Sequence, residues 1–369
     1  MNLQNTSRRL RVALIPPLWA RVAPGTQGGV ECIVYLLAEE LVRRGHQVTV
    51  FTSSDSITTA RVQALCEWNM IEAMERGRAW EYEYYESCNI AEALCKRGSF
   101  DIIHSHVGCH AIPLGVLSRT PVLHTLHNPI TPDAIWVLER YAYAAVTAVS
   151  WQQVAGVPDQ RRRGIRVINN GCDFDSYEFS PSPGKYLAFL GRMGAGKSPL
   201  DAIRIADEAG MPIVLAGQPL DEAERIYFRE KIEPLIDGDK VVYIGQADHP
   251  QKCALLRGAA ALLFPIQAEE AFGLVMIEAM ACGTPVIAFQ RGPVEEVVDF
   301  GKTGFYADSV RALSSFVPLA LALDRRIVRE HAKERFGHVR MVDEYLQAYE
   351  LLLNATGNAR TPVTPAMEL

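Results

Sequence analysis

Two carboxylates, Glu270 and Glu278, stand eight positions apart within the segment EEAFGLVMIEAMACGTPVIAF at 269–289. A helix that begins near Gly273 would carry Glu278 on an otherwise apolar face, where a carboxylate is costly unless it is hydrogen-bonded. The neighbouring hydroxyls of a ribose would satisfy that carboxylate, and Glu270 in the preceding loop could reach sugar hydroxyls. The first backbone amides of the same helix could face phosphate or sugar oxygens. The alternative is a buried Glu278 that bridges two backbone amides.

A glycine-rich segment with two cations, GRMGAGKS at 191–198, follows an expected strand and opens an expected helix. It matches the P-loop pattern of ATP- and GTP-binding proteins. Two features argue against a nucleotide triphosphatase: Pro199 lacks a backbone N–H for phosphate, and no later strand ends in an Asp that would bind Mg²⁺. Arg192 and Lys197 at a helix N-terminus instead predict a site for a diphosphate. A solvated turn with two surface cations is the remaining alternative.

Histidines gather in and after two expected strands, at His104, His106, His110, His124 and His127. Imidazoles are common metal ligands, and strand ends converge in a parallel α/β fold. No carboxylate or cysteine joins His104 and His106 at ligand spacing, however, so we expect no metal site. We expect His104 to lie in the core or to support a neighbouring residue.

Short apolar runs alternate with helical patterns along the whole chain, which predicts an α/β fold. The first unit is a strand at 10–15, a glycine-rich loop, a helix at 30–44 and a β-branched strand at 47–52, and such a crossover requires a parallel sheet. Further strands are expected at 101–106, 121–127, 144–150 and 165–170 and, after the Ser- and Pro-rich stretch 175–185, at 186–191, 211–217, 240–245, 260–265 and 284–289. The pattern predicts two Rossmann-like halves, with parallel sheets whose carboxyl ends face a shared cleft.

Helices are expected between these strands and near the C-terminus, at 198–209, 221–233, 250–258, 273–281, 309–323 and 326–354. The region 55–100 is irregular, and its cluster of aromatic residues has no assigned element. The residues from 357 onward are expected to form a loose tail.

Length and composition limit the class of protein. The 369 residues suit two domains, and 49% hydrophobic with 22% charged residues exclude general disorder. The 43 acidic residues outnumber the 37 basic ones, and the formal charge of −6 argues against a nucleic-acid partner. The eight cysteines include no CxxC pair, so we expect reduced thiols in a cytoplasmic protein. We expect no signal peptide and no membrane helix, because no apolar run is long enough.

The Glu-x7-Glu segment resembles the donor-binding signature of the retaining glycosyltransferases of family 4, the group 1 type, which have the GT-B fold. GTQGGVECIVYLLAEELVRRGHQVTVFT resembles the first βαβ unit of that family, GRMGAGKSPLDAIRIA its diphosphate loop and INNGCD its entry to the second domain. RFGHVRMVDEYLQAYELLL at 335–353 resembles the C-terminal helix that crosses back to the first domain. The resemblance implies an acceptor-binding domain at 1–172 with the crossing helix 337–354, a donor-binding domain at 173–336 and a loose tail at 355–369.

The resemblance also assigns roles to single residues. Arg192 and Lys197 would bind the donor diphosphate, and Glu278 the ribose. His106 would contact the donor sugar near the reacting centre. The implied catalytic residues are His106, Arg192, Lys197 and Glu270; the implied donor-binding residues are Gly28, Gly29, Arg192, Lys197, Glu270, Ala271, Phe272, Gly273, Leu274 and Glu278; and His127 and Asn128 would line the same cleft.

Four positions depart from the family pattern. Gly196 and Ser198 replace an acidic residue and a glycine, which creates the match to a P-loop. Ala271 stands where Pro is common, and Cys172 where an aliphatic residue is common. None of these departures removes a functional group.

A member of this family would move a hexose from a nucleoside diphosphate sugar to a hydroxyl, with retention at the anomeric carbon and without a metal or another cofactor. UDP-glucose is the first expected donor because it is common in the family. The proline-containing loop 16–29 resembles the branch that glycosylates small molecules, so we expect a small-molecule acceptor before a saccharide. Retention would follow a front-face route, with a covalent route through Glu270 or the His106 region as the alternative.

Three other functions remain open: a sugar-nucleotide epimerase of the same architecture, a P-loop NTPase, and a binding module without turnover. The epimerase would need no acceptor, and the NTPase would hydrolyse ATP or GTP with Mg²⁺. We expect neither nucleic-acid nor integral-membrane partners, and the sequence leaves the oligomeric state open.

Overall fold

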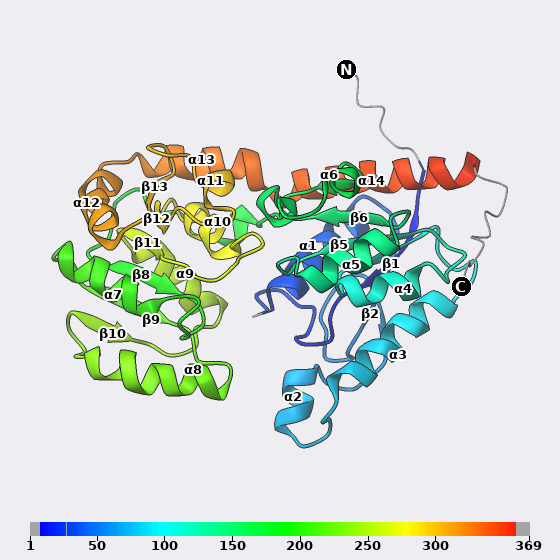
Figure 1. The fold of residues 1–369 in the computed structure, drawn as a ribbon, viewed down its shortest axis with the longest axis horizontal. Coiled ribbons are helices and arrows are strands. Elements are labelled where there is room, and N and C mark those ends of the chain that lie inside the picture. Colours follow the sequence, from blue (N-terminus) through cyan, green and yellow to red (C-terminus); the bar gives the residue numbers. More distant parts are fainter. Residues whose placement is uncertain (1–7, 27, 359–369) are drawn as a thin grey trace.

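Two α/β halves, each built around a parallel sheet, make up the structure, a computed structural model that describes residues 8–26 and 28–358. Figure 1 shows the halves side by side along the longest axis. The first sheet has seven strands in the order β3-β2-β1-β4-β5-β6-β7. These strands are β1 (Arg11–Ile15), β2 (Gln47–Thr52), β3 (Arg61–Ala64), β4 (Ile102–Ser105), β5 (Val122–Leu126), β6 (Ala145–Ala148) and β7 (Ile165–Val167).

The first sheet follows the expected βαβ order. The last four residues of β1 are buried, as in a strand that helices cover on both faces. Val12 pairs in parallel register with Val48 on one side and with Ile102 on the other. The sequence does not predict β3, because its residues RVQA lie at the sheet edge, are partly exposed and form no apolar run.

The second sheet has six strands in the order β10-β9-β8-β11-β12-β13, all parallel. They are β8 (Leu187–Leu190), β9 (Ile213–Ala216), β10 (Val241–Tyr243), β11 (Ala261–Phe264), β12 (Val286–Phe289) and β13 (Gly304–Ala307). Neighbouring residues of β11 serve different cores: Leu262 packs in one apolar cluster and Leu263 in the other, as alternation along a strand requires. The sequence does not predict β13, which is four residues long and begins with glycine.

Helices connect the strands in both halves. The N-terminal half contains α1 (Gly29–Arg43), α2 (Met70–Glu75), α3 (Tyr82–Cys95), α4 (Ile112–Gly115), α5 (Pro132–Arg140) and α6 (Asp159–Arg162). The C-terminal half contains α7 (Pro199–Glu208), α8 (Glu222–Tyr227), α9 (His249–Gly258), α10 (Leu274–Ala281), α11 (Val294–Val297), α12 (Val310–Leu321) and α13 (Arg325–Phe336), and α14 (His338–Asn358) follows. The irregular region 55–100 therefore holds β3, α2 and α3, and residues 70–95, here called the α2–α3 arm, project beyond the first sheet (Figure 1).

The segment expected as one helix at 326–354 is broken at Gly337 into α13 and α14. The backbone of Cys172 passes through this break. Its N–H donates to the Phe336 carbonyl at 2.8 Å, and the His338 N–H donates to the Cys172 carbonyl at 3.0 Å. The two chain segments that connect the halves, one at Cys172 and one at Gly337, therefore run side by side. The helical pattern continues across the break, so the sequence alone does not reveal it.

Helix α14 returns to the N-terminal half and completes its core. Met341, Tyr345 and Tyr349 are buried in the same cluster as the apolar face of α1. The Tyr349 hydroxyl lies 2.7 Å from Nδ1 of His104, beneath the first sheet's centre. Figure 1 shows α14 in red along the N-terminal half. Residues 355–358, expected in the tail, belong to α14, and the tail from residue 359 lies outside the described residues.

Among the described residues, no helix combines the length and the apolar composition that crossing a membrane requires. All eight cysteines lie in this part of the chain, and each is a free thiol. Cys88 and Cys95 are exposed, and the others are partly or fully buried.

Candidate active site

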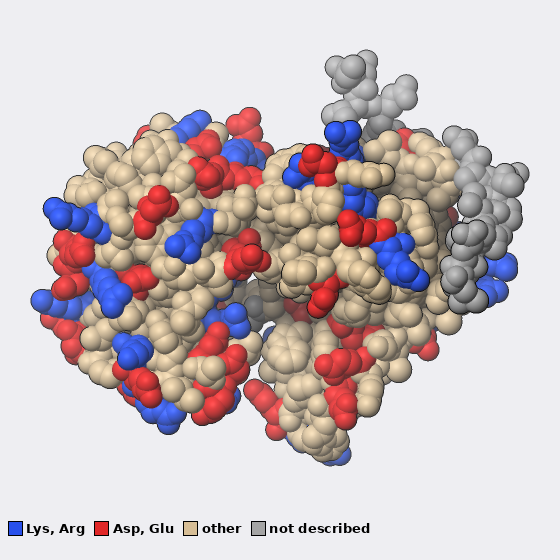
Figure 2. Space-filling view, in the orientation of Figure 1, with Lys and Arg blue, Asp and Glu red and all other residues tan. Residues whose placement is uncertain are grey.

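A cleft of about 1240 Å³ lies between the two halves, at the carboxyl ends of both sets of strands. Figure 2 shows the hollow between the two lobes. Segments after β1, β4 and β5 line one wall, and segments after β8 and β9, together with part of α10, line the other. Nine of the residues predicted from the sequence line this cleft: Gly28, Gly29, His106, His127, Asn128, Arg192, Lys197, Leu274 and Glu278.

The loop that carries Arg192 and Lys197 connects β8 to α7. It ends at Ser198, whose φ of 55° lies in the left-handed region that favours glycine. The Arg192 guanidinium is half exposed and lies 3.3 Å from Oε1 of Glu224. Lys197 forms an ion pair with Glu270. Each cation is thus held by one carboxylate and keeps further N–H donors for an anion in the cleft.

The backbone of this loop is not arranged as a P-loop. In a P-loop, successive backbone N–H groups bind the phosphates. Here the N–H groups of Lys197 and Ser198 both donate to the Gly194 carbonyl at 3.1 Å, and the Met193 N–H donates to the Gln218 carbonyl at 3.2 Å. The amides of Lys197 and Ser198 are therefore occupied within the loop, and its cationic side chains remain available to an anion.

Glu278 lies on α10 and lines the cleft together with a partner that the sequence does not reveal. Its Oε1 atom accepts hydrogen bonds from the Tyr177 hydroxyl at 2.9 Å and from Nζ of Lys252 at 2.5 Å. Side chains hold this carboxylate, so it does not bridge two backbone amides. Burial lowers the pKa of Lys252, but the neighbouring Glu278 carboxylate outweighs burial and the net direction is upward. The sequence does not single out Lys252, because a lysine in the expected helix 250–258 is typical of a solvated helix face.

The start of α10 depends on one glycine. Gly273 has a φ of 82°, and a Cβ at this position would lie 2.7 Å from Cε of Met276, so the turn requires glycine. The first amides of a helix have no acceptor inside the helix. Leu274, the first residue of α10, lines the cleft, so these amides begin at its edge.

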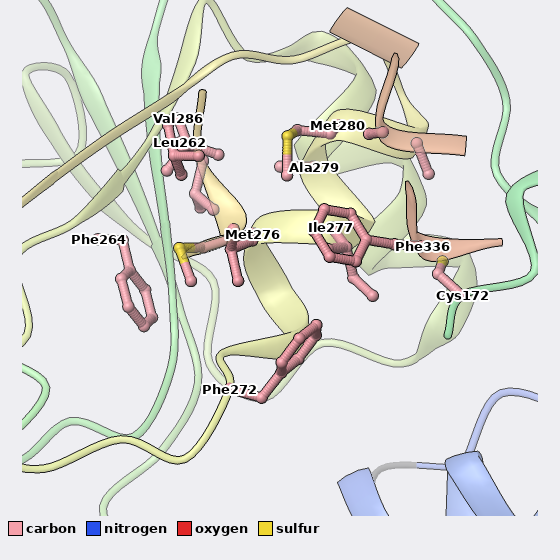
Figure 3. Packing of buried hydrophobic residues seen from close by; sticks show 14 of the residues in the cluster. Cys172, Leu262, Phe264, Phe272, Met276, Ile277, Ala279, Met280, Val286 and Phe336 are labelled. Atoms are coloured by element: carbon pink, nitrogen blue, oxygen red, sulfur yellow. The ribbon is translucent and has the colours of Figure 1, made fainter. Parts of the chain in front are cut away.

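The residues before Gly273 hold the loop in place. Phe272 is buried and packs against Phe336 of α13 (Figure 3). The Ala271 carbonyl accepts a hydrogen bond from the Ser150 hydroxyl of the N-terminal half at 2.6 Å. The residues from Glu270 to Gly273 are not among those that line the cleft, and Glu270 reaches it through its ion pair with Lys197. The structure thus places nine of the predicted residues in the lining of the cleft, and the other four, from Glu270 to Gly273, are not part of that lining.

Neutral histidines lie at the end of β4 and β5. Nδ1 of His106 lies 2.9 Å from Nε2 of His127, and the His104 and His106 rings are 3.9 Å apart. Burial lowers the pKa of His106 well below 6.5 and lowers that of His127 to about 3. Nε2 of His106 is buried and has no partner among the described residues. His104 is bonded to Thr125 and Tyr349 and therefore supports the other two from the core.

Two buried glutamates on the N-terminal wall also line the cleft. Oε1 of Glu31, on α1, accepts a hydrogen bond from the Ala20 N–H at 3.0 Å, and burial raises the pKa of Glu31 to about 7. Gly28 makes room for this carboxylate, because a Cβ there would lie 2.2 Å from Oε2 of Glu31. Glu86, on α3, lies 2.7 Å from Nε2 of His110. An acidic residue on the apolar face of the first helix is the signal that could have revealed Glu31.

The two walls of the cleft differ in charge. Arg192, Lys197 and Lys252 come from the C-terminal half and favour an anion, while the N-terminal wall offers carboxylates and neutral imidazoles. In the part of the chain that the structure describes, no group of three or more His, Cys, Asp and Glu side chains is placed to hold a metal ion. The arrangement suits an anionic molecule against the C-terminal wall and a hydroxyl-rich molecule against the N-terminal one.

Two family models match the chain one after the other. Residues 27–176 match the model described as Glycosyltransferase Family 4. Residues 176–335 match the model described as Glycosyl transferases group 1. The two matches together extend from the loop before α1 to the end of α13.

Individual proteins are similar over nearly the whole chain. D-inositol 3-phosphate glycosyltransferase of Mycolicibacterium smegmatis is 27% identical, over 93% of this chain and 91% of that protein. AviGT4, a glycosyltransferase involved in avilamycin A biosynthesis, superimposes with a TM-score of 0.71 at 24% identity, over 94% of this chain and 98% of the other. Anabaena HepE, in complex with UDP-glucose, has a TM-score of 0.67 at 20% identity, over 92% and 100% of the two chains. The structural matches share the two-domain fold.

Proposed function

This chain belongs to the family 4 glycosyltransferases with the GT-B fold, and we propose that it moves a hexose from a nucleoside diphosphate sugar to a hydroxyl of a small molecule, with retention at the anomeric carbon. The observation that carries the proposal is that Arg192, Lys197 and Glu278, far apart in the sequence, line one cleft. A diphosphate between the two cations and a ribose at the carboxylate would use all three groups.

UDP-glucose is the proposed donor. The similarity to HepE, whose structure holds UDP-glucose, supports this choice. The transferred sugar would lie between His106 and the start of α10, next to Glu270. The residues from Ala271 to Leu274 would contribute backbone groups there, and Gly28 and Gly29 would allow the donor or acceptor to approach α1 closely.

The chemical difficulty of the transfer is the charge that develops on the departing diphosphate. Arg192, Lys197 and the N-terminal amides of α10 would stabilise that charge, and preorganised donors of this kind contribute about 3 kcal/mol each to a transition state. These residues supply the positive charge themselves, so the proposed reaction requires no metal and no cofactor. Closure of the two halves would keep water away from the activated sugar.

Retention is proposed to follow a front-face route, in which a phosphate oxygen of the donor accepts the proton of the attacking hydroxyl. Nε2 of His106 is unpartnered among the described residues, which suits contact with a sugar hydroxyl near the reacting centre. His127 and Asn128 line the same part of the cleft and would position the acceptor. A covalent route through Glu270 or the His106 region is the alternative, and Glu270 is ion-paired with Lys197.

Three further assignments complete the proposal. The acceptor-binding domain is residues 1–172 with the crossing helix 337–354, and the donor-binding domain is residues 173–336. The protein works in the cytoplasm, in keeping with eight free thiols. It acts without nucleic-acid or integral-membrane partners.

A screen of thermal stability against UDP-, GDP- and ADP-glucose and MgATP, each with and without EDTA, tests the donor. We expect one sugar nucleotide to raise Tm with EDTA present, and mass spectrometry to detect a hexosylated product after incubation with cell extract. Protection by MgATP alone would favour an NTPase. A converted donor sugar without any acceptor would favour an epimerase of the same architecture.

A further inference from the structure

We propose that the acceptor is a hydroxylated molecule that carries a basic amine and no phosphate, and that Glu86 and Glu31 bind its ammonium group on the N-terminal wall of the cleft. This inference rests on the proposed function and adds the chemical class of the acceptor. It differs from the acceptor in the names of the curated relatives, which is an inositol phosphate.

The two carboxylates are held where an acceptor must lie. Glu31 is 3% exposed and Glu86 is 5% exposed, yet both line the cleft between the halves. Glu86 accepts a hydrogen bond from the Tyr82 hydroxyl and pairs with His110, so its orientation is fixed. Glu31 lies against Gly28 at the start of α1, close enough that no side chain fits there. Burial raises the pKa of Glu31 to about 7, and an ammonium group bound beside it would favour its ionised form.

The same wall has no arginine or lysine among the described residues that line the cleft. Arg192, Lys197 and Lys252 all belong to the C-terminal half. Burial lowers the pKa of His106 and of His127, so these imidazoles are neutral. A phosphate on the acceptor would meet acidic side chains on this wall, where the His110 imidazole already pairs with Glu86, and like charges in a partly buried site repel strongly.

The surface of the α2–α3 arm, near the mouth of the cleft, is also acidic. The α2–α3 arm contains six glutamates and two arginines between residues 70 and 95. Figure 2 shows mainly acidic side chains where this arm faces the viewer, below the opening of the cleft. An acidic field at the mouth of a cleft raises the local concentration of cations and lowers that of anions.

A pair of aromatic rings on the same wall also suits an amino polyol. The Trp19 and Tyr82 rings both line the cleft, and their centroids are 5.5 Å apart in an edge-to-face arrangement. Aromatic faces bind ammonium groups and the C–H face of a sugar-like ring.

Competition between matched acceptors tests this inference. With saturating donor, kcat/KM is measured for 2-deoxystreptamine, for its N-acetylated form, for myo-inositol and for inositol 3-phosphate. We expect the free amine to be used about tenfold better than the acetylated or neutral compounds, and inositol 3-phosphate to be used least. A preference for the phosphate, equal use of amine and acetylated amine, or no amine binding to the UDP-loaded protein would overturn the inference.

Single substitutions test whether Glu86 and Glu31 bind the amine. Glu86→Gln and Glu31→Gln should each raise the KM of the amine about tenfold without changing the KM of the donor. Glu83→Gln is the matched control, because Glu83 is an exposed residue of α3 that does not line the cleft. Donor binding is measured on the same protein. Its loss would contradict the proposed function, whereas normal donor binding with a preference for phosphate would contradict the acceptor class alone.

Discussion

Nζ of Lys252, on α9, lies 2.5 Å from Oε1 of Glu278, on α10, and the Tyr177 hydroxyl donates to the same oxygen at 2.9 Å. These two donors hold the carboxylate in one orientation. Because a pair of ribose hydroxyls needs an oriented acceptor of this kind, we infer that Lys252 positions the Glu278 carboxylate for the donor.

Removing either member of this pair should weaken donor binding more than it slows transfer. We expect Glu278→Gln and Lys252→Ala each to raise the donor KM about tenfold, with kcat changed less. The double variant should be little worse than either single one, because the two residues act as a unit. Arg257→Ala is the control on the same helix, since Arg257 pairs with Glu178 on the surface. An unchanged donor KM in Glu278→Gln would contradict the ribose contact.

Removing a cation of the donor loop should reduce turnover itself. We expect Arg192→Ala and Lys197→Ala each to lower kcat at least about 100-fold, because charge on the departing diphosphate loses a preorganised partner. Arg204→Ala, which removes a half-exposed arginine paired with Asp201 on α7, should leave kcat unchanged. Near-normal turnover in both loop variants would rule out the diphosphate assignment.

The buried Glu31 should make stability depend on pH. Burial raises the pKa of Glu31 from 4.5 to about 7, so the folded state binds a proton that the unfolded state has released, and stability falls as the pH rises through this range. Glu31→Gln removes the cost of charging. The variant should exceed the wild type by up to roughly 3 kcal/mol at about pH 8, and the difference should vanish below about pH 4.5. Urea unfolding at several pH values measures it, and a difference independent of pH would contradict the buried carboxylate.

Gly273 should tolerate no side chain, for two separable reasons. Gly273→Ala adds left-handed backbone strain and places a Cβ 2.7 Å from Cε of Met276 and 3.1 Å from Cζ of Phe264. Gly210→Ala adds the strain alone, because Gly210 has a φ of 66° and open space around it. We expect Gly210→Ala to cost about 1 kcal/mol of stability with normal turnover. Gly273→Ala should cost more and should also raise the donor KM. Equal effects would show that the start of α10 is not shaped by this contact.

The sequence predicts two parallel sheets and their central strands, because these strands are continuous apolar runs between helical patterns. It misses β3 and β13, which lie at sheet edges where burial is partial or the strand is short. It also misses the break at Gly337, since the helical pattern runs through it and a contact with Cys172, distant in the sequence, creates it. Local periodicity carries no information about such long-range contacts.

Long-range contacts also explain why the sequence predicts only part of the site. Glu278, Arg192 and Lys197 of the C-terminal half stand in short sequence motifs, and the resemblance to family 4 glycosyltransferases identifies them. Lys252, Glu31 and Glu86 stand in ordinary amphipathic helices, and only the packing of the two halves brings them to the cleft. Their roles depend on neighbours such as Tyr177 and His110, which no spacing rule connects to them.

We infer that Arg192, Lys197 and Glu278 bind a nucleoside diphosphate sugar in the cleft. The decisive experiment is titration calorimetry of the wild type and of an Arg192→Ala/Lys197→Ala variant with UDP-, GDP- and ADP-glucose in the presence of EDTA. We expect one of these donors to bind the wild type and to bind the folded variant at least about tenfold more weakly. Equal binding to both proteins, or no binding to the wild type while MgATP binds, would contradict it.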